Sequence, residues 1–296
     1  MKKRPEILLI GADGQVGWEL QRTLAPLGNL TRATLNGRWE WALDLANAES
    51  IAWVLRETRP DIVINAAAYT AVDKAETEQD LAQRINGDAP GLLGRLLAER
   101  RVPVLHYSTD FVFSGQAERP YQEDDEPGPL NVYGATKLDG ENRLLDSGAP
   151  ALILRTSWVY GRYGQNFLLT MQRLLREREE LKVVDDQIGA PTWSRLLAEV
   201  SAQLLYRVLS GDIDLERHSG LYQVTGGGQT SWWGFAKAIQ QASGAHCRLL
   251  PILSRDYPSP AKRPTYSVLD NGKLLETFGL ALPHWETSLA MCLAET

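Results

Sequence analysis

Short apolar runs alternate with amphipathic stretches along the first half of the chain. The clearest runs lie at 7–10, 61–65, 102–107 and 151–155, with a weaker one at 30–35. After the first run, Val16, Leu20, Leu24 and Leu27 recur at helical spacing up to Gly28. A short continuous apolar run is typical of a strand buried on both faces. The pattern therefore predicts an α/β fold with a Rossmann-like, doubly wound parallel sheet.

Further amphipathic stretches predict helices at 48–58, 78–100 and 133 onwards, and the alternation loosens after residue 160. There the pattern predicts helices at 166–179, 194–209 and 232–242, with a late strand at 220–224. We expect a dinucleotide-binding domain in 1–160. Residues 161–296 would form mainly a smaller substrate-binding lobe, with some segments returning to the first domain. The glycine run 226–228 lacks a following Gly-Lys-Ser/Thr and predicts a loop, not a phosphate-binding P-loop.

Composition narrows the function classes. The chain has 296 residues, a net charge of −6 and 23% charged residues, which favours neither nucleic acid nor an anionic membrane as partner. No apolar run approaches the roughly 18 residues of a membrane span. Cys247 and Cys292 have no metal or disulfide spacing, which fits a cytoplasmic enzyme. The four histidines show no ligand spacing, and the sequence assigns none of them a function.

Three glycines directly follow the first apolar run. Gly11, Gly14 and Gly17 stand at G-x-x-G-x-x-G spacing, with Gln15 and Val16 between the last two. A strand, a glycine turn and a helix in succession point backbone N–H groups and a helix N-terminus at a phosphate. The spacing differs from the G-x-G-x-x-G fingerprint, but it serves the same tight turn and close backbone approach. The alternative is that the glycines serve the turn alone.

The end of the second predicted strand bears on cofactor choice. Folds that prefer NAD commonly carry an acid there for the ribose 2′-hydroxyl, and this chain has Thr34, with Arg32 and Arg38 nearby. A missing carboxylate and nearby guanidinium groups would tolerate a 2′-phosphate. We therefore expect NADPH to serve at least as well as NADH. The alternative, that both arginines are solvated surface groups, stays open at this point.

A tyrosine and a lysine suggest the chemistry. Tyr133 and Lys137 lie four residues apart at the start of a predicted helix, so they share one face. A nearby ammonium would lower the pKa of the phenol, which could then exchange protons with an alcohol or a ketone. Ser108 and Thr109 follow a predicted strand at the edge of the sheet where ligands bind. Alone, the Tyr133 and Lys137 pair could also be a solvated helix face.

Taken in order, these motifs resemble the extended short-chain dehydrogenase/reductase superfamily. The finer resemblance is to the dTDP-4-dehydrorhamnose reductase family, and it spreads over most of the chain. It rests on the motifs at 14–17, 65–76, 107–113, 155–161, 186–192 and 263–264. The resemblance implies reduction of the 4-keto group of dTDP-4-dehydro-L-rhamnose to dTDP-L-rhamnose by NADPH or NADH, for surface polysaccharide.

The resemblance also implies roles for individual residues. Tyr133 would protonate the developing alkoxide, and Lys137 would lower the phenol's pKa and hold the nicotinamide ribose. Thr109 would hydrogen-bond the reacting oxygen or Tyr133. Besides Tyr133 and Lys137, the expected cofactor-lining residues are Gly11, Gly14, Gln15, Val16, Gly17, Thr34, Asp44, Leu45, Ala68, Tyr69, Thr70 and Tyr107. The expected substrate-contacting residues are Thr109, Asp110, Trp158, Lys74 and Arg263, the last in a proline-bounded loop at 258–264.

The chain departs from the family in two places. Thr34 replaces the ribose-binding acid. Some members dimerise through Mg²⁺ held by glutamates, and here only Glu19 clearly matches, with Arg195 where another acid is expected. We therefore predict no metal, and either a monomer or a homodimer.

Two other readings stay open. One is another nucleotide-sugar oxidoreductase, such as an epimerase or a dehydratase. A dehydratase usually follows the Ser or Thr with Asp-Glu, whereas Thr109 precedes Asp110-Phe111. The other is a non-catalytic NADP-binding regulatory subunit, as in the beta subunit of methionine adenosyltransferase, which is similar to this family.

Overall fold

The central element of the fold is a seven-stranded parallel sheet. The computed structural model describes residues 4–295, and the seven strands are those found among these residues. In order across the sheet they are β11 (Gly220–Gln223), β6 (Ala151–Thr156), β5 (Val104–Thr109), β4 (Ile62–Asn65), β1 (Glu6–Ile10), β2 (Asn29–Thr34) and β3 (Trp41–Ala42). Strand order reverses between β1 and β4. The predicted doubly wound Rossmann-like sheet is therefore confirmed.

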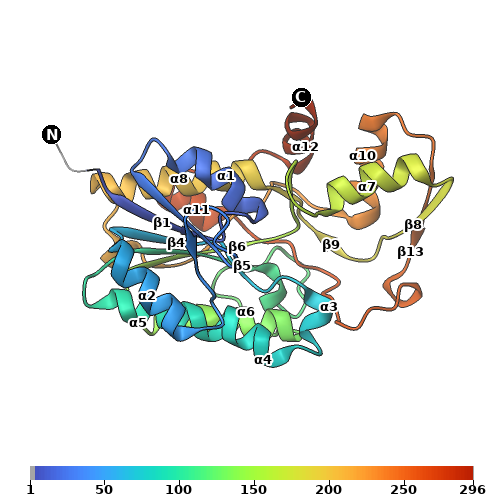
Figure 1. Ribbon diagram of the computed structural model, residues 1–296. Coiled ribbons are helices and arrows are strands. Elements are labelled where there is room, and N and C mark those ends of the chain that lie inside the picture. Colours follow the sequence, from blue (N-terminus) through green and yellow to red (C-terminus); the bar gives the residue numbers. More distant parts are fainter. Residues whose placement is uncertain (1–3, 296) are drawn as a thin grey trace.

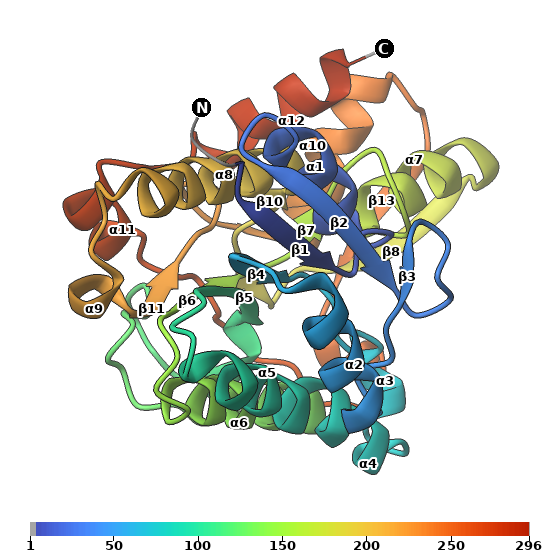
Figure 2. The ribbon, with the colours of Figure 1, turned by 60° about the vertical axis from the view of Figure 1, so that its left-hand side comes forward.

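Helices cover both faces of this sheet (Figures 1 and 2). One face carries α1 (Gln15–Leu24), α8 (Ser194–Ser210) and α11 (Gly272–Phe278), and the other carries α2 (Ala48–Thr58), α5 (Ala89–Ala98) and α6 (Val132–Leu145). Within β1, Ile7 and Leu9 pack into the first core, and Leu8 and Ile10 pack into the second. Because successive side chains of a strand point to opposite faces, a strand covered on both sides must be apolar throughout.

The segment predicted as one helix over 78–100 is interrupted. It consists of α4 (Gln79–Ala82), the π-helical turn η1 (Gln83–Asp88) and α5, and the short helix α3 (Val72–Ala75) precedes it. The N–H of Ala89 donates to the carbonyl of Arg84, five residues earlier. Pro90 explains the interruption, since it has no N–H and its ring would clash with the carbonyl of Asn86 in a regular helix.

The C-terminal half builds a second, smaller lobe, at the right of Figure 1. Its own core joins α7 (Phe167–Glu177), α10 (Trp232–Ser243), α12 (Trp285–Ala294) and the parallel pair β8 (Glu180–Val184) and β13 (Arg248–Ile252). The remaining short elements are β7 (Val159–Tyr160) with β10 (Thr192–Trp193), β9 (Ile188–Gly189) with β12 (Thr230–Ser231), α9 (Leu215–His218), η2 (Asp110–Val112) and η3 (Ser254–Asp256). Three later elements, α8, β11 and α11, return to the first sheet. The division at residue 160 into cofactor and substrate parts stays a prediction.

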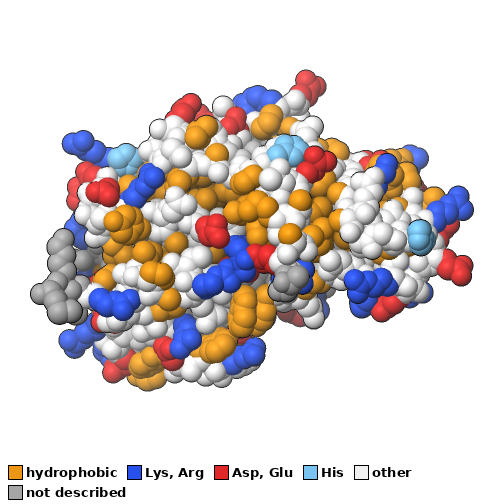
Figure 3. Space-filling model, turned by 90° about the horizontal axis from the view of Figure 1, so that it is seen from above, with side chains coloured by type: hydrophobic (Ala, Val, Ile, Leu, Met, Phe, Trp, Pro, Cys, Tyr) orange, Lys and Arg blue, Asp and Glu red, His pale blue; other side chains and the backbone are white. Residues whose placement is uncertain are grey.

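On the face seen in Figure 3, neither positive nor negative side chains predominate. Basic and acidic side chains are interspersed there over apolar and neutral groups, and the described residues of this face form no extended basic patch. In residues 4–295 we also find no helix with the length and apolar character that crossing a membrane requires.

Candidate active site

The turn between β1 and α1 brings backbone amides to the carboxyl edge of the sheet. Gly11 has φ +81°, and a Cβ there would lie 2.7 Å from the amide nitrogen of Ala67. A Cβ on Gly17 would lie 1.9 Å from the carbonyl oxygen of Gly11, so both positions need glycine for the chain's own packing. Gly14 differs, because a Cβ there would meet no protein atom closer than 3.4 Å.

The N-terminus of α1 is free to meet a ligand. Its N-cap is Gly14, whose position offers no side-chain cap, and no acidic side chain lies in the first turn. The Oε1 atom of Gln15 is buried without a hydrogen-bond partner among the described residues. Uncapped N–H groups and a buried acceptor without a partner fit an anionic group with donors of its own, such as a dinucleotide.

The segment after β4 is tied to two helices. The carboxamide of Asn86 accepts from the amide of Tyr69 at 2.9 Å and donates to the carbonyl of Tyr69 at 3.1 Å. Its nitrogen also lies 3.3 Å from the hydroxyl of Thr136 on α6. The phenol of Tyr69 donates to Glu78 at 2.7 Å, and this hydrogen bond raises the pKa of Tyr69. Tyr69 therefore presents its backbone, together with Ala68 and Thr70, at the sheet edge.

Thr109, Asp110 and Tyr133 come together at the end of β5. Asn131 caps α6 by accepting from the amide of Gly134 at 2.8 Å. A Cβ on Gly134 would lie 2.1 Å from the carbonyl oxygen of Phe111, so glycine there lets α6 press against η2. The hydroxyl of Thr109 donates to the carboxylate of Asp110 at 3.1 Å. The close approach of helix and strand end brings the Tyr133 ring to this edge.

The ionisation of these groups differs from the expectation for the phenol. Burial raises the pKa of Tyr133 to about 12, and an interaction with the Thr109 hydroxyl lowers it by less. Burial likewise raises the pKa of Asp110 to about 6, against opposing hydrogen bonds from Ser267 and Thr109. The expected lowering of the phenol's pKa is thus absent, because removal from water outweighs the nearby polar groups. At neutral pH Tyr133 holds a proton that it can donate.

Lys137 is buried and held by β5. Its Nζ donates to the carbonyl oxygen of Tyr107 at 2.6 Å and lies 3.1 Å from Nε2 of His106. Burial lowers the pKa of Lys137 to about 8, while Glu141 acts in the opposite direction. The phenol of Tyr107 points away from this edge, to the hydroxyl of Ser201 on α8 at 2.6 Å. Tyr107 therefore contributes its backbone carbonyl, and its side chain packs elsewhere.

The sequence analysis did not identify the contact between two buried side chains, those of His106 and Asn65. Both side chains are 1% exposed, and they face each other across β4 and β5 with Nδ2 of Asn65 3.1 Å from Nδ1 of His106. The interpretation that the sequence assigns no histidine a function overlooked this position. The available signal was a polar residue inside each of two buried parallel strands, where a burial cost must be offset by hydrogen bonds.

Trp158 lies at the boundary with the second lobe. It has φ +44°, an uncommon backbone conformation for a non-glycine residue, and its ring stacks on Trp232 with centroids 3.6 Å apart. A Cβ on Gly189 would lie 2.5 Å from the Trp158 indole, so Gly189 makes room for the ring. The Gln187 side chain donates to Ser254 at 2.9 Å. The 186–192 motif therefore supports the Trp158 ring with its glycine and anchors the neighbouring loop.

Arg263 is engaged by the protein itself. Its guanidinium donates to Asp73 at 2.9 Å, to the Ser259 hydroxyl at 2.6 Å and to the carbonyl of Ala261 at 3.2 Å. Asn131 donates to the carbonyl of Lys262 at 2.7 Å. The loop 258–264 of the second lobe thus rests on α3 and on the start of α6. Lys74, beside Asp73, is exposed.

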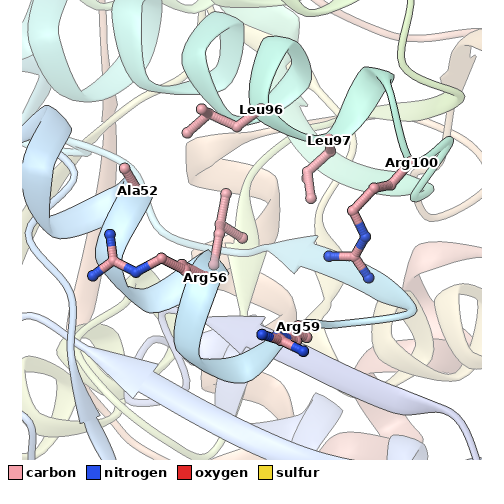
Figure 4. Close-up of a pocket in the computed structure, with 7 residues that line it drawn as sticks. Ala52, Arg56, Arg59, Leu96, Leu97 and Arg100 are labelled. Atoms are coloured by element: carbon pink, nitrogen blue, oxygen red, sulfur yellow. The ribbon is translucent and has the colours of Figure 1, made fainter.

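One pocket lies away from these residues. It has a volume of about 530 Å³ and lies between α2 and α5. Figure 4 shows Arg56, Arg59 and Arg100 around it, together with Leu96 and Leu97. Both helices end here, just before β4 and β5 begin, so the pocket lies at the amino edge of the sheet. It contains no acid-base pair and lies at the opposite edge from Tyr133.

Comparison with known proteins identifies the family. A family model described as "RmlD substrate binding domain" matches residues 5–296. The dTDP-4-dehydrorhamnose reductase of Burkholderia thailandensis is 44% identical over 300 residues, covering 98% of each chain. That of Escherichia coli K12 is also 44% identical, covering 98% of this chain and 97% of the relative. The chain belongs to the dTDP-4-dehydrorhamnose reductase family.

A solved structure of this reductase family supports the same assignment. The dTDP-4-dehydrorhamnose reductase of Bacillus anthracis, in complex with NADP, superposes with a TM-score of 0.90 at 35% identity. The match covers 99% of this chain and 100% of that one. The shared fold thus extends over both lobes.

The sequence predicts the ribose end of the cofactor site near the end of β2, where Thr34 lies. Thr34 is buried, and its hydroxyl accepts from the amide of Arg38 at 3.0 Å. Arg32 forms an ion pair with Glu40, with Nε 2.9 Å from Oε1, whereas Arg38 forms no ion pair among the described residues. Both guanidiniums lie over the ring of Trp39, at 5.3 and 5.5 Å from its centroid. Of the two candidate arginines, Arg38 is the one without a carboxylate partner.

Asp44 and Leu45, which the sequence also predicts to line the cofactor, contact neighbouring parts of the chain. Asp44 accepts from the amide of Ala46 at 2.8 Å, and its own amide donates to Ser50 at 3.0 Å. Leu45 is 7% exposed and belongs to the core on the α2 face. Asp44 thus shapes the turn that leads into α2.

At the position where the family resemblance predicts a second acid, this chain has Arg195. Arg195 on α8 pairs with Glu19 of α1, with Nε 3.4 Å from Oε2, and also with Glu295. Glu19 is 4% exposed and makes a further ion pair with Arg22. A guanidinium thus lies between the two acids, and the described residues contain no cluster of three or more metal-ligating side chains.

Proposed function

We propose that this chain reduces the 4-keto group of dTDP-4-dehydro-L-rhamnose to give dTDP-L-rhamnose, with NADPH or NADH as the reductant. The observation that carries the proposal is the meeting of Thr109, Tyr133 and Lys137 at one sheet edge, in a chain 44% identical to two named reductases of this activity. Chains that merely share the fold need not share these groups.

In this mechanism Tyr133 is the general acid. The phenol is protonated at neutral pH, because burial raises its pKa to about 12, and it donates its proton to the carbonyl oxygen as negative charge develops there. The Thr109 hydroxyl donates to Asp110 at 3.1 Å, and on substrate binding it would turn its single hydrogen to the same carbonyl oxygen. Lys137, held at Tyr107 and His106, would contact the nicotinamide ribose.

The cofactor would lie across the carboxyl edge of the sheet. The amides of Gln15 and Val16 would bind the diphosphate, because the N-terminus of α1 is uncapped and has space above Gly14. The amide of Gly14 itself donates to the carbonyl of Gly11 at 3.0 Å and shapes the turn. Ala68, Tyr69 and Thr70 would present backbone groups beside the nicotinamide half. When bound there, the reduced nicotinamide supplies the hydride.

The sugar nucleotide would lie between the two lobes. Asp110 and Trp158 would contact the sugar, since one ends β5 and the other leaves β6 on the same edge. Lys74 and Arg263 would approach the diphosphate from α3 and from the loop 258–264. Support comes from their position on facing sides of the lobe boundary, where Arg263 contacts Asp73.

We further propose a cytoplasmic enzyme that acts as a monomer or a homodimer, with a nucleotide sugar as its partner and no nucleic acid or membrane. Cys247 and Cys292 support the compartment, since both are free and buried.

The test is turnover of the sugar nucleotide. dTDP-4-dehydrorhamnose is generated in situ from dTDP-glucose, and oxidation of NADPH or NADH is followed at the nicotinamide absorbance. Stoichiometric oxidation with formation of dTDP-L-rhamnose is the expected result. Cofactor binding without oxidation would contradict the proposal and direct attention to other keto sugar nucleotides and to a regulatory role. A Tyr133→Phe variant serves as the matched inactive control.

A further inference from the structure

His106 lies in a buried chain of hydrogen bonds that runs from β4 to α6. The parallel register of β4 and β5 sets it directly opposite Asn65. Its Nδ1 lies 3.1 Å from Nδ2 of Asn65, and its Nε2 lies 3.1 Å from Nζ of Lys137. All three side chains are 1% exposed, so water does not compete for their hydrogen bonds.

The orientation of Asn65 determines which imidazole nitrogen accepts. Its Oδ1 accepts from the amide of Ala67 at 3.2 Å, which leaves the NH₂ group facing His106. A carboxamide NH₂ group only donates, so Nδ1 of His106 must accept. A neutral imidazole carries one hydrogen, and that hydrogen therefore lies on Nε2, where it points at Lys137.

The same reasoning determines the protonation state of Lys137. An ammonium has three donors and no acceptor, so it would set one N–H against the N–H of His106. An amine offers its lone pair to Nε2–H and still donates to the carbonyl of Tyr107 at 2.6 Å. The geometry therefore matches an uncharged Lys137. Burial, followed by a positive charge on Lys137, lowers the pKa of His106 well below its usual value, and the backbone of Asn65 acts in the opposite direction. The imidazole is therefore neutral.

We propose that His106, oriented by Asn65, is a positioning residue that donates from Nε2 to Lys137 and so favours its amine form. Because of this hydrogen bond, Lys137 loses its proton at a lower pH than a lysine without such a donor would. The catalytic meaning of this inference rests on the proposed function, since Lys137 matters there as the group beside Tyr133.

Other charged groups around the pair bear on the same equilibrium. Glu141, one turn beyond Lys137 on α6, favours the ammonium, but it is paired with Arg155 of β6 at 2.7 Å. Tyr133 and Asp110 lie towards the sheet edge, and Tyr107 turns its phenol to α8. With Glu141 offset by Arg155, burial and the hydrogen bond from His106 both favour the amine, while the Tyr107 carbonyl at 2.6 Å accepts from either form of Lys137.

The tautomer can be measured directly on the intact protein. With ¹⁵N-histidine labelling, the four imidazoles give separate nitrogen signals, and those of His106 are assigned by their loss in His106→Gln. We expect the Nε2-protonated tautomer, with no titration of His106 between about pH 5.5 and about pH 8. A ring protonated at Nδ1, or one that titrates normally, would overturn the proposal whatever the enzyme's substrate.

Activity provides the second test through two matched variants. In His106→Gln the side-chain oxygen accepts from an ammonium, so the limb of the pH profile of kcat/KM that reports Lys137 should move up by about one unit or more. His106→Asn keeps the contact with Asn65 but loses that with Lys137, and we expect no upward shift. Equal profiles for the wild type and His106→Gln would reject the proposed effect of His106 on Lys137. Absence of turnover in the wild type would instead reject the proposed function and leave the tautomer measurement valid.

Discussion

The guanidinium of Arg263 donates to the carboxylate of Asp73 at 2.9 Å, across 190 residues of sequence. This ion pair lowers the pKa of Asp73 and joins the loop 258–264 to α3. Because the two side chains are 25% and 43% exposed, the pair should contribute no more than about 1 kcal/mol to stability. The ion pair therefore positions the loop at the lobe boundary more than it stabilises the fold.

Substitutions of Arg263 and Asp73 should distinguish an effect on substrate binding from an effect on the ordering of the loop 258–264. Arg263→Gln removes the cation proposed to meet the diphosphate, and we expect KM for the sugar nucleotide to rise about 10-fold, as for loss of a charge-assisted hydrogen bond. Asp73→Asn keeps the guanidinium and should change KM by less than about 2-fold. Steady-state kinetics at saturating NADPH measures both. Equal increases in the two variants would show that Arg263 acts only by ordering the loop.

Tyr133→Phe should abolish proton donation and leave the fold intact. The phenol hydroxyl interacts with the hydroxyl of Thr109, and the ring packs edge-on against Phe111, with ring centroids 5.9 Å apart. We expect kcat to fall by about 10²–10⁴, the usual contribution of a positioned acid. Cofactor affinity, measured by quenching of tryptophan fluorescence, should stay within about 2-fold. Undiminished turnover would remove Tyr133 from the mechanism.

Much of this arrangement could be predicted from the sequence, because it depends on local patterns. The runs around Ile7 and Val63 predict buried strands, and the ends of parallel strands necessarily meet at one edge. The Tyr133 and Lys137 spacing places both residues on one face of α6. What could not be predicted depends on tertiary register and burial. Nothing local indicates that Asn65 faces His106 or that Arg263 meets Asp73.

The direction of the tyrosine's pKa shift illustrates the same limit. From the sequence, an ammonium four residues away predicts a lowered pKa for Tyr133. In the structure Nζ of Lys137 points to β5, where it contacts Tyr107 and His106. Burial therefore determines the pKa of Tyr133 and raises it. Pro90 is a comparable case, since its effect on a predicted helix was readable in principle but its result, a π-helical turn that lets Asn86 hold Tyr69, was not.

Asp110 should make stability depend on pH. Its pKa is raised to about 6 in the folded protein from 3.8, so the folded state prefers the protonated form. The associated stability is fully present below about pH 4 and is lost as pH rises through about 6, by up to about 3 kcal/mol. Asp110→Asn should therefore gain stability relative to the wild type between these values.

Denaturant unfolding of both proteins at several pH values measures this difference. Other carboxyl groups titrate in the same range, so the informative quantity is the difference in unfolding free energy between variant and wild type. If this difference stays constant with pH, ionisation of Asp110 does not lower the stability of the folded protein. We also expect Asp110→Asn to lose sugar-nucleotide turnover, because the same carboxylate orients Thr109.

Arg38 should decide the preference between NADPH and NADH. It forms no ion pair among the described residues, whereas Arg32 is already bound to Glu40, and the buried Thr34 supplies no carboxylate for a ribose 2′-hydroxyl. Arg38→Ala should lower kcat/KM for NADPH by about 10-fold, in line with one exposed contact to a phosphate, and should leave that for NADH within about 2-fold. Arg32→Ala is the matched control. It removes a guanidinium that lies over the same Trp39 ring and whose charge Glu40 already neutralises.

A larger change in the NADPH/NADH ratio of kcat/KM in Arg32→Ala than in Arg38→Ala would assign the 2′-phosphate contact to Arg32 instead. Equal losses of kcat/KM with both cofactors in Arg38→Ala would mean that Arg38 supports the loop and does not contact the 2′-phosphate.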